Sequence, residues 1–228
     1  MEQLFDLSQE YDFMLNQGLS VTGETKEYFI HGRIKDLVKT LPANFKISRI
    51  LDFGCGIGDT TFILSQYFPD VEIIGTDLSN EALKYANEKY STKSIKFVHL
   101  SNIPQNHFDL VYVNGVFHHI EPEKRIEAIR NIYNSLTSQG LFALFENNPW
   151  NIGSRIVMRR IKFDRDAKPL NYITTTTILK KGGFEEIICS RFLFYFPKAL
   201  SILRFTEKFL VKIPLGAQYY VLARKKAH

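Results

Sequence analysis

The sequence predicts an α/β fold in which seven strands form a mostly parallel sheet with helices on both of its faces. Three observations lead to this prediction. Short apolar runs alternate with segments of helical periodicity through most of the 228-residue chain. Two of these runs lead into an acidic residue, and the first then continues into a glycine-rich turn. Apolar residues make up 45% of the chain, which is enough to cover both faces of such a sheet.

The expected elements follow this alternation in chain order. Residues 1–40 have a helical pattern that stops at Pro42, because proline cannot continue a helix. Ser79 is expected to cap the helix over 80–90, and Pro122 is expected to begin the helix over 122–136. The expected strands are 48–53, 71–76, 95–100, 108–113 and 141–146, and the helices between them are 59–67, 80–90 and 122–136. Such alternation is typical of a parallel sheet with right-handed crossovers.

The last third of the chain departs from this alternation. Aromatic-rich runs at 184–196 and 214–224 are expected to form two further strands, and insertions occupy about 147–170 and 197–213. The second insertion has apolar residues on one helical face and Arg204, Lys208 and Lys212 on another, which predicts a basic amphipathic helix. Such a helix either packs on the domain or, over 198–213, contacts a membrane surface.

The most informative motif joins the first strand to the helix that follows it. Asp52, Gly54, Gly56 and Gly58 occupy alternate positions there. Glycine lets a turn adopt unusual dihedral angles and lets a ligand approach the backbone closely. Dinucleotide sites need a longer glycine spacing, which brings a helix N-terminus to the pyrophosphate. Here the third glycine comes one residue early and Asp59 would repel a pyrophosphate, which disfavours a dinucleotide-dependent oxidoreductase.

This motif resembles the acid-x-Gly-x-Gly-x-Gly motif of class I S-adenosylmethionine-dependent methyltransferases, and residues 47–224 resemble that family as a whole. The resemblance implies a Rossmann-like sheet whose last two strands form an antiparallel hairpin. It also implies that the glycine loop, which includes Cys55, wraps the methionine part of the cofactor, and that Asp77 binds the ribose hydroxyls. The expected cofactor is S-adenosyl-L-methionine (SAM), and the expected product is S-adenosyl-L-homocysteine.

Further cofactor contacts are expected at the tips of the next strands, because ligands of an open parallel sheet bind outside the carboxyl ends of its strands. Leu78 follows Asp77 and is expected to pack on the adenine ring. The family reads the adenine with polar groups after the third strand, where Ser101 and Asn102 stand here. Asn102 replaces the usual acid, and a plain turn asparagine is the alternative. Asn114, after the fourth strand, is expected to contact the methionine moiety.

His118 and His119 are the candidate general bases, with Tyr11 and Glu146 in reserve. The two histidines belong to a segment that resembles the apolar-x-His-His-apolar sequence of small-molecule methyltransferases. Methyl transfer mainly requires positioning of the acceptor, and an oxygen or nitrogen acceptor also needs a base, for which histidine is suited. The choice between the two stays open. No metal is predicted, because adjacent residues point differently and no third ligand has a recognisable spacing.

The acceptor pocket is expected after the fifth strand. Glu146, Asn148 and Trp150 are assigned to shape it, and Arg155 to bind an anionic group such as phosphate or carboxylate. The sequence therefore predicts a small-molecule acceptor, and lipid-linked intermediates and sugar nucleotides are favoured by the basic insertions and the aromatic tail. Residues 1–45 are expected to form a helical lid over a methyltransferase domain at 46–228.

Charge and composition leave two alternatives open. The net charge is +5, with the basic excess in the last third, which fits an anionic substrate, a membrane surface or RNA. An RNA methyltransferase or a non-catalytic cofactor-binding partner subunit therefore stays possible, although no RNA-binding module is recognisable. DNA amine methylation is disfavoured, because residues 114–117 read Asn-Gly-Val-Phe where those enzymes carry Asn-Pro-Pro-Tyr. Two cysteines, no long apolar run and no signal-peptide pattern predict a cytoplasmic protein.

Overall fold

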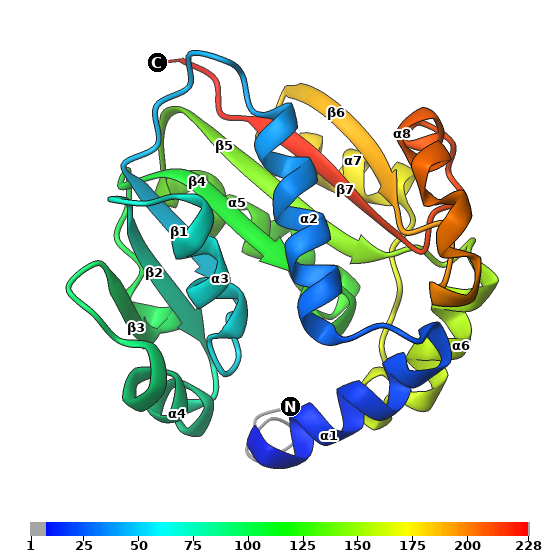
Figure 1. Cartoon of the computed structure of the whole chain (residues 1–228). Coiled ribbons are helices and arrows are strands. Elements are labelled where there is room, and N and C mark those ends of the chain that lie inside the picture. Colours follow the sequence, from blue (N-terminus) through cyan, green and yellow to red (C-terminus); the bar gives the residue numbers. More distant parts are fainter. Residues whose placement is uncertain (1–7, 228) are drawn as a thin grey trace.

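A seven-stranded sheet organises the chain (Figure 1). The computed structural model describes residues 8–227, with the side chains of residues 14–162 and 164–227. The strands lie in the order β3-β2-β1-β4-β5-β7-β6, and within the described chain only β7 runs against the others. Their bounds are β1 (Arg49–Phe53), β2 (Glu72–Asp77), β3 (Ile95–His99), β4 (Phe108–Asn114), β5 (Leu136–Asn147), β6 (Glu186–Leu193) and β7 (Gln218–Arg224). The predicted fold class is confirmed.

The strand order reverses between β1 and β4. β1 pairs with β2 on one side and with β4 on the other, so the connections leave in opposite directions from this point. In open α/β sheets the crevice beside such a reversal, outside the carboxyl ends of the strands, is where ligands bind. The tips of β1, β2, β3 and β4 therefore define where a functional site should lie.

Helices cover both faces of the sheet. The core on one face combines strand residues with α5 (Arg125–Ser135) and α7 (Tyr172–Lys181), and the core on the other combines them with α2 (Lys26–Thr40) and α3 (Asp59–Tyr67). β4 feeds both cores, because alternate residues point to opposite faces. This two-sided burial explains its almost uninterrupted apolar sequence. α4 (Asn80–Tyr90) begins where expected, since the Ser79 hydroxyl accepts a hydrogen bond from the backbone of Ala82.

The segment between β6 and β7 departs from the prediction. It forms a 3₁₀ segment, η7 (Lys198–Thr206), and a single turn of α-helix, α8 (Glu207–Leu210), rather than one amphipathic α-helix. Two side chains explain the difference. Arg204 donates to the carbonyl of Phe196, and Glu207 accepts from the backbone amides of Tyr195 and Phe196. These bonds fold the segment back onto the end of β6, which a straight helix could not do.

The N-terminal helices differ in how they join the domain. α2 is built into the core, where Ile34 and Leu37 are fully buried, and Asp36 accepts a bidentate hydrogen bond from Arg191. α1 (Ser8–Leu19) instead contacts α6 (Ile152–Arg160), which belongs to the insertion after β5. The two helices lie side by side at the open end of the sheet (Figure 1). In the part of the chain described, no helix combines the length and apolar character needed to cross a membrane.

Candidate active site

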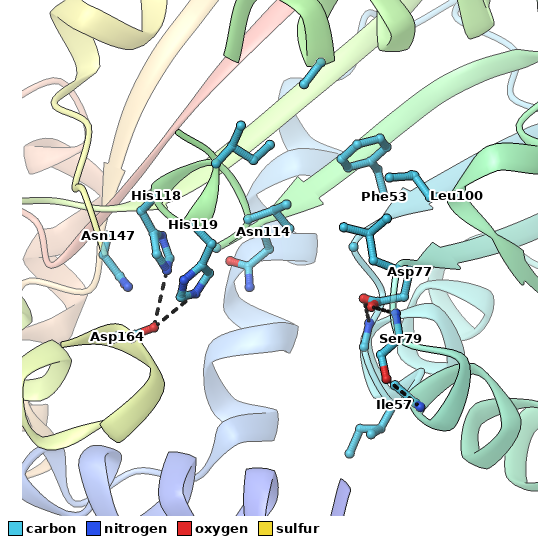
Figure 2. Close-up of a pocket in the computed structure, with 18 of the residues that line it drawn as sticks. Phe53, Ile57, Asp77, Ser79, Leu100, Asn114, His118, His119, Asn147 and Asp164 are labelled. Atoms are coloured by element: carbon cyan, nitrogen blue, oxygen red, sulfur yellow. Dashed lines mark hydrogen bonds and ion pairs between the residues drawn. The ribbon is translucent and has the colours of Figure 1, made fainter. Parts of the chain in front are cut away.

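A cavity of about 760 Å³ lies at the strand tips where the topology predicts a ligand. This volume is in the range of about 300–1,000 Å³ that is typical of small-molecule sites. Figure 2 shows two groups of side chains across it, with Asn114 between them. One group comprises Phe53, Ile57, Asp77, Ser79 and Leu100, and the other comprises His118, His119, Asn147 and Asp164.

Asp77 ties the glycine turn to the start of α4. Its two carboxylate oxygens accept hydrogen bonds from the backbone amides of Gly56 and Ser79, each at 2.9 Å. The turn is also fixed to β2, because the amides of Gly54 and Cys55 donate to the carbonyl of Thr76. Asp77 therefore stands at the rim of the cavity in a fixed orientation, and each of its oxygens still has a lone pair for a ligand hydroxyl.

The three glycines of the turn have different roles, although all have positive φ. A Cβ on Gly54 would overlap the side chain of Val116, and one on Gly58 would lie 2.8 Å from the ring of Phe97. These two positions need glycine because of neighbouring protein atoms. At Gly56 a Cβ would meet nothing within 4 Å, so the space above this residue is open. An open space beside a fixed carboxylate fits a cofactor that lies across the turn.

Asp52 and Cys55 lie beneath the turn rather than in the main cavity. They line an adjoining cavity of about 90 Å³, and the Asp52 carboxylate accepts a 2.7 Å hydrogen bond from Thr61. Asp52 is 2% exposed, and this burial raises its pKa to about 7. Burial likewise raises the pKa of the Cys55 thiol. Asp52 therefore ties the end of β1 to Thr61 on α3, and Cys55 is a buried residue of the turn itself.

Of the remaining residues expected to bind the cofactor, three line the main cavity and one does not. Leu78, Ser101 and Asn114 line the main cavity. Asn102 is exposed and stands outside the described lining. Sequence reasoning missed the apolar side chains Phe53, Ile57, Leu100 and Ile103, which line the same half. Their position at strand tips was the available signal, but apolar residues there also suit an ordinary core.

Glu146 organises the histidine segment from behind. One of its carboxylate oxygens accepts hydrogen bonds from the backbone amides of Phe117 and His118, and the other lies 2.6 Å from Nδ1 of His118. Glu146 is itself buried and outside the described lining, so it is a positioning group and does not shape the pocket surface. Burial alone would lower the pKa of His118, but the carboxylates of Glu146 and Asp164 outweigh it and raise this pKa to about 10.

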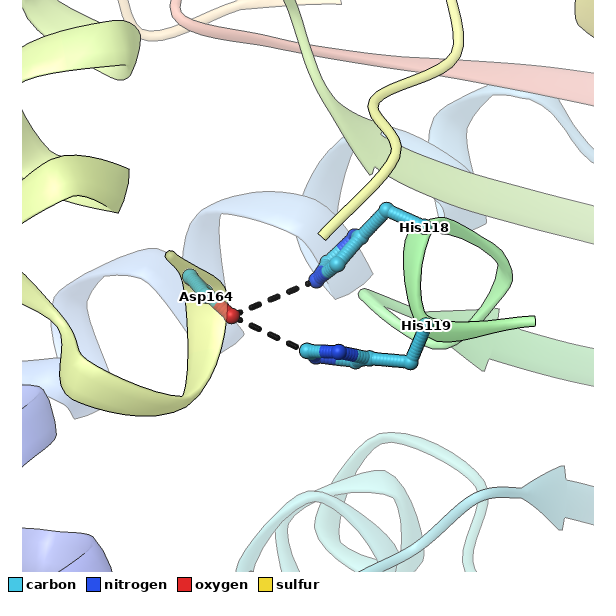
Figure 3. A group of neighbouring side chains, drawn as sticks. All are labelled: His118, His119 and Asp164. Atoms are coloured by element: carbon cyan, nitrogen blue, oxygen red, sulfur yellow. Dashed lines mark ion pairs between the residues drawn. The ribbon is translucent and has the colours of Figure 1, made fainter. Parts of the chain in front are cut away.

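Asp164 joins the two histidines from a distant part of the chain. It ends the short 3₁₀ turn η6 (Lys162–Asp164) in the insertion after β5. Its Oδ1 lies 3.4 Å from Nε2 of His118 and 3.3 Å from Nε2 of His119 (Figure 3). Burial would raise the pKa of Asp164, and the contacts with the two imidazoles lower it instead. No sequence signal marked Asp164, because nothing in its spacing links it to the histidines.

The insertion is held against the histidine segment by further hydrogen bonds. The backbone amide of Lys168 donates to the carbonyl of His118 at 2.8 Å. The buried Arg125 guanidinium bridges the two segments, since it donates to the carbonyls of Ile120 and Lys168 at 2.9 and 2.6 Å. The position of Asp164 is therefore determined by tertiary contacts on both sides of it.

Three of the expected acceptor residues lie away from the described lining of the cavity. Asn148 is buried and its side-chain amide donates to the carbonyls of Pro214 and Gly216, so it holds the approach to β7. Trp150 packs edge-on against Tyr172, and Arg155 is exposed on α6. The physical reason is that the chain turns away after Asn147. Tyr11 falls in α1, outside the described side chains. The polar side chains that do line this half include Asn147, Arg33 and Gln218.

The fold and the cavity together define an α/β domain whose main cavity lies at the point where the strand order reverses. A protein-family model described as a methyltransferase domain matches residues 51–142. An uncharacterized methyltransferase of Staphylococcus carnosus is 29% identical over 150 residues, which cover 64% of this chain and 67% of that protein. The carboxy-S-adenosyl-L-methionine synthase of Campylobacter concisus is 32% identical over 117 residues, which cover 49% of this chain and 48% of that protein. The chain thus matches about half to two thirds of the length of these relatives.

A solved structure extends the likeness to nearly the whole fold. The SAM-dependent methyltransferase from Archaeoglobus fulgidus matches with a TM-score of 0.70 over 94% of this chain and 100% of that one, at 19% identity. The fold of the chain is therefore that of class I SAM-dependent methyltransferases, as the sequence predicted, and the methyltransferase-domain model matches its central part. The solved structures from Archaeoglobus fulgidus and Mesorhizobium loti are both described as SAM-dependent methyltransferases.

Proposed function

We propose that this protein transfers the methyl group of SAM to a small molecule bound in the half of the cavity that His119 and Asp164 line. One observation carries the proposal: a single cavity contains both the open space above Gly56 and the histidine cluster (Figure 2). When bound, SAM supplies a methyl group on a positively charged sulfur, which is already a good leaving group. The protein then has to hold the acceptor in line with that methyl group.

The cofactor half is assigned from the contacts already described. The Asp77 carboxylate, fixed by Gly56 and Ser79, would bind the ribose hydroxyls through its remaining lone pairs. Leu78 and Leu100 would pack on the adenine, and Asn114 would bind the amino-acid end. In this assignment Gly56 allows the close approach of the ligand, while Asp52 supports the turn that holds it.

The acceptor half is assigned to His119 rather than His118. The His118 side chain is 3% exposed, and carboxylates flank both of its ring nitrogens. The His119 side chain is 18% exposed and lines the same cavity. His119 is therefore the imidazole that an acceptor can touch, and a role for it as the general base stays a prediction. α1, which also lines the cavity, is assigned as its lid.

A binding and labelling experiment tests this function. Calorimetry should give SAM binding that Asp77→Ala weakens about 10- to 100-fold, since a hydrogen bond to a charged group contributes about 1.5–3 kcal/mol. His119→Ala should leave this affinity unchanged and lower turnover, whereas the control His107→Ala, outside the described lining of the cavity, should change neither. Methyl-labelled SAM incubated with lysate fractions should label the lipid or nucleotide-sugar fraction.

The same experiment decides between this function and its alternatives. Label in the RNA fraction would favour an RNA methyltransferase. SAM binding with no labelled fraction would favour a non-catalytic partner subunit. NADH binding with no SAM binding would contradict the assignment of the cofactor half.

The exposed residues between β6 and β7 support a lipid-linked acceptor. Seven apolar side chains there are exposed, and we call them the apolar patch: Leu200, Ile202, Leu203, Phe205, Phe209, Ile213 and Leu215. Ile202 is 81% exposed and Phe209 is 72% exposed. Exposed lysines accompany them, whereas Arg204 is already paired with Glu24. Asn151, the N-cap of α6, donates a hydrogen bond to the carbonyl of Leu215 in this segment, and α6 lines the cavity through Val157.

We propose that the apolar patch contacts an anionic lipid surface, because apolar side chains flanked by lysines match the headgroup boundary of such a membrane. Flotation with vesicles of phosphatidylserine and phosphatidylcholine should recover the protein, and Ile202→Glu with Phe209→Glu should abolish recovery. Val38→Glu, at an exposed site on α2, is the control and should still float. Equal recovery with vesicles of pure phosphatidylcholine would contradict the proposal that the lysines attract the protein to anionic lipid. A cytoplasmic location stays a prediction.

A further inference from the structure

The histidine cluster has the composition of a metal centre. Two imidazoles and one carboxylate converge there, and their ligand atoms all lie within 4.8 Å of one another (Figure 3). We propose that His118, His119 and Asp164 bind a divalent transition-metal ion of the zinc or iron(II) class, which faces the acceptor half of the cavity. Two histidines with one carboxylate is a donor set that such ions favour in proteins.

The two distances from Asp164 to the histidines suit ligands around an ion. Oδ1 of Asp164 lies 3.4 Å from Nε2 of His118 and 3.3 Å from Nε2 of His119. A charge-assisted hydrogen bond between such groups would be about 2.7–2.9 Å. Ligand atoms placed tetrahedrally at about 2.0–2.1 Å from an ion lie about 3.3 Å from one another. The His118–Glu146 pair, at 2.6 Å, shows what a direct hydrogen bond looks like in the same site.

Glu146 supplies the outer support that metal-binding histidines usually have. Its carboxylate takes the Nδ1 side of His118, which leaves Nε2 of that ring directed at Asp164. A carboxylate behind a ligating histidine fixes the tautomer and raises the basicity of the other nitrogen. Glu146 also holds the backbone of the histidine segment through the amides of Phe117 and His118. The cluster is therefore built in two layers, as in established metal sites.

The charge of the histidine cluster and its access to the cavity also favour a metal ion. The carboxylates of Glu146 and Asp164 are both buried and both face the imidazoles, so the site favours a positive charge between them. His118, His119 and Asp164 all line the cavity, whereas Glu146 stands behind them. Three protein ligands with one open side are the arrangement of a catalytic rather than a structural metal site.

The role of the ion rests on the proposed methyl transfer, but its binding does not. An acceptor oxygen that coordinates a divalent ion loses its proton to solvent more readily, because the ion stabilises the resulting anion. The methyl group then passes from sulfur to that oxygen: the carbon–sulfur bond breaks with its electron pair left on sulfur, and a carbon–oxygen bond forms. In this proposal Asp164 is a metal ligand, which gives a reason for its position beside the histidines.

The test is metal binding by the intact, tag-free protein after treatment with a chelator. Titration with Co²⁺ should give visible d–d absorption that saturates at one ion per chain, and Zn²⁺ should displace it. His119→Ala and Asp164→Asn should weaken binding at least 100-fold, because each removes a ligand. Glu146→Gln should weaken it about 10- to 100-fold, which is the usual effect of losing such an outer partner.

Controls separate this inference from the proposed function. His107→Ala, which removes a histidine outside the cavity, should bind Co²⁺ like the wild type. Thermal unfolding should show that Asp164→Asn is folded, so that lost binding is not lost structure. The metal-site proposal would be overturned if Co²⁺ and Zn²⁺ showed no saturable binding. It would also be overturned if His119→Ala and Asp164→Asn bound these ions as tightly as the wild type. SAM calorimetry on the chelator-treated protein tests the methyltransferase assignment independently.

Discussion

Gly56 differs from the other two glycines of the turn in what a Cβ at its position would meet. This difference separates a role in ligand binding from a role in packing. Gly54 and Gly58 face protein atoms, and Gly56 faces open space beside Asp77. A motif written as three equivalent glycines therefore contains two kinds of position. Sequence shows the spacing, but only the surroundings of each Cβ show which position the ligand uses.

Gly56→Ala should weaken SAM binding at least 10-fold while the protein stays folded. The new methyl group occupies the space above the turn, and the φ of +53° adds about 1–2 kcal/mol of strain. Gly183→Ala is the matched control, because φ is +114° there and the position lies outside the described lining. Calorimetry should show lower affinity for Gly56→Ala alone. Equal losses in both variants would mean that strain, not the ligand's path, is responsible.

Asp52 should make stability depend on pH. Its pKa is about 7 when folded against 3.8 for the free side chain, so between these values the folded protein holds a proton that the unfolded chain has released. This contribution therefore stabilises the fold at low pH and is lost as the pH rises towards 7. Burial is the largest cause, the nearby Asp77 carboxylate adds to it, and the Thr61 hydrogen bond and Arg33 oppose it.

Asp52→Asn removes this titration and can keep the bond from Thr61. Urea unfolding of both proteins from pH 5 to pH 8 should show the variant gaining stability relative to the wild type as the pH rises. From pH 5 to pH 8 the gain should be on the order of 3 kcal/mol, from about two pKa units at about 1.36 kcal/mol each. A difference that does not change with pH would mean that Asp52 is ionised in the folded protein throughout.

At the scale of elements, the insertion after β5 carries most of what the sequence did not reveal. It supplies Asp164 to the histidines, and Arg125 on α5 fixes it through two carbonyls. The expected acceptor residues of this region were chosen by proximity to the strand end. After Asn147 the chain turns away from the cavity. Asn148 then donates a hydrogen bond to the carbonyl of Pro214, and Trp150 packs against Tyr172. Asp164 lies further along the insertion and lines the cavity.

Arg125→Ala should destabilise the fold by about 2–4 kcal/mol, because two partly buried carbonyls lose their charged donor. The insertion should loosen locally, so proteolysis near residues 160–170 should become faster while SAM affinity is kept. Arg130→Ala, at an exposed position on the same helix, is the control. Urea unfolding and limited proteolysis make the measurement. A wild-type cleavage rate in Arg125→Ala would show that the insertion is held by other contacts.

At the scale of the whole molecule, two segments outside the residues that the family model matches line the cavity. α1 comes from the N-terminal region and α6 from the insertion, and both contribute to its lining. They meet at Gly18, where a Cβ would overlap the side chain of Ile161. The described residues of α1 lie outside the core clusters, so we propose that this contact closes the site more than it supports the fold.

Gly18→Leu should push α1 away from α6 and speed the dissociation of SAM several-fold. The melting temperature should change little, because the overpacked contact lies outside the core. Stopped-flow displacement of SAM measures the dissociation rate, and Ile161→Ala in the same protein should restore the wild-type rate by making room. A large loss of stability with an unchanged rate would show that α1 belongs to the core and is not a lid.

The sequence by itself determined the sheet, the glycine turn and Asp77, because these depend on local periodicity and on residues adjacent in the chain. It also gave His118 and His119 as candidates, but not which of them an acceptor can reach. Only the tertiary structure brought Asp164 to the histidines, placed Glu146 behind them and left the apolar patch exposed. The physical reason is that these relations join residues far apart in the chain. Their distances are fixed by long-range hydrogen bonds and packing, which leave no periodic signal in the sequence.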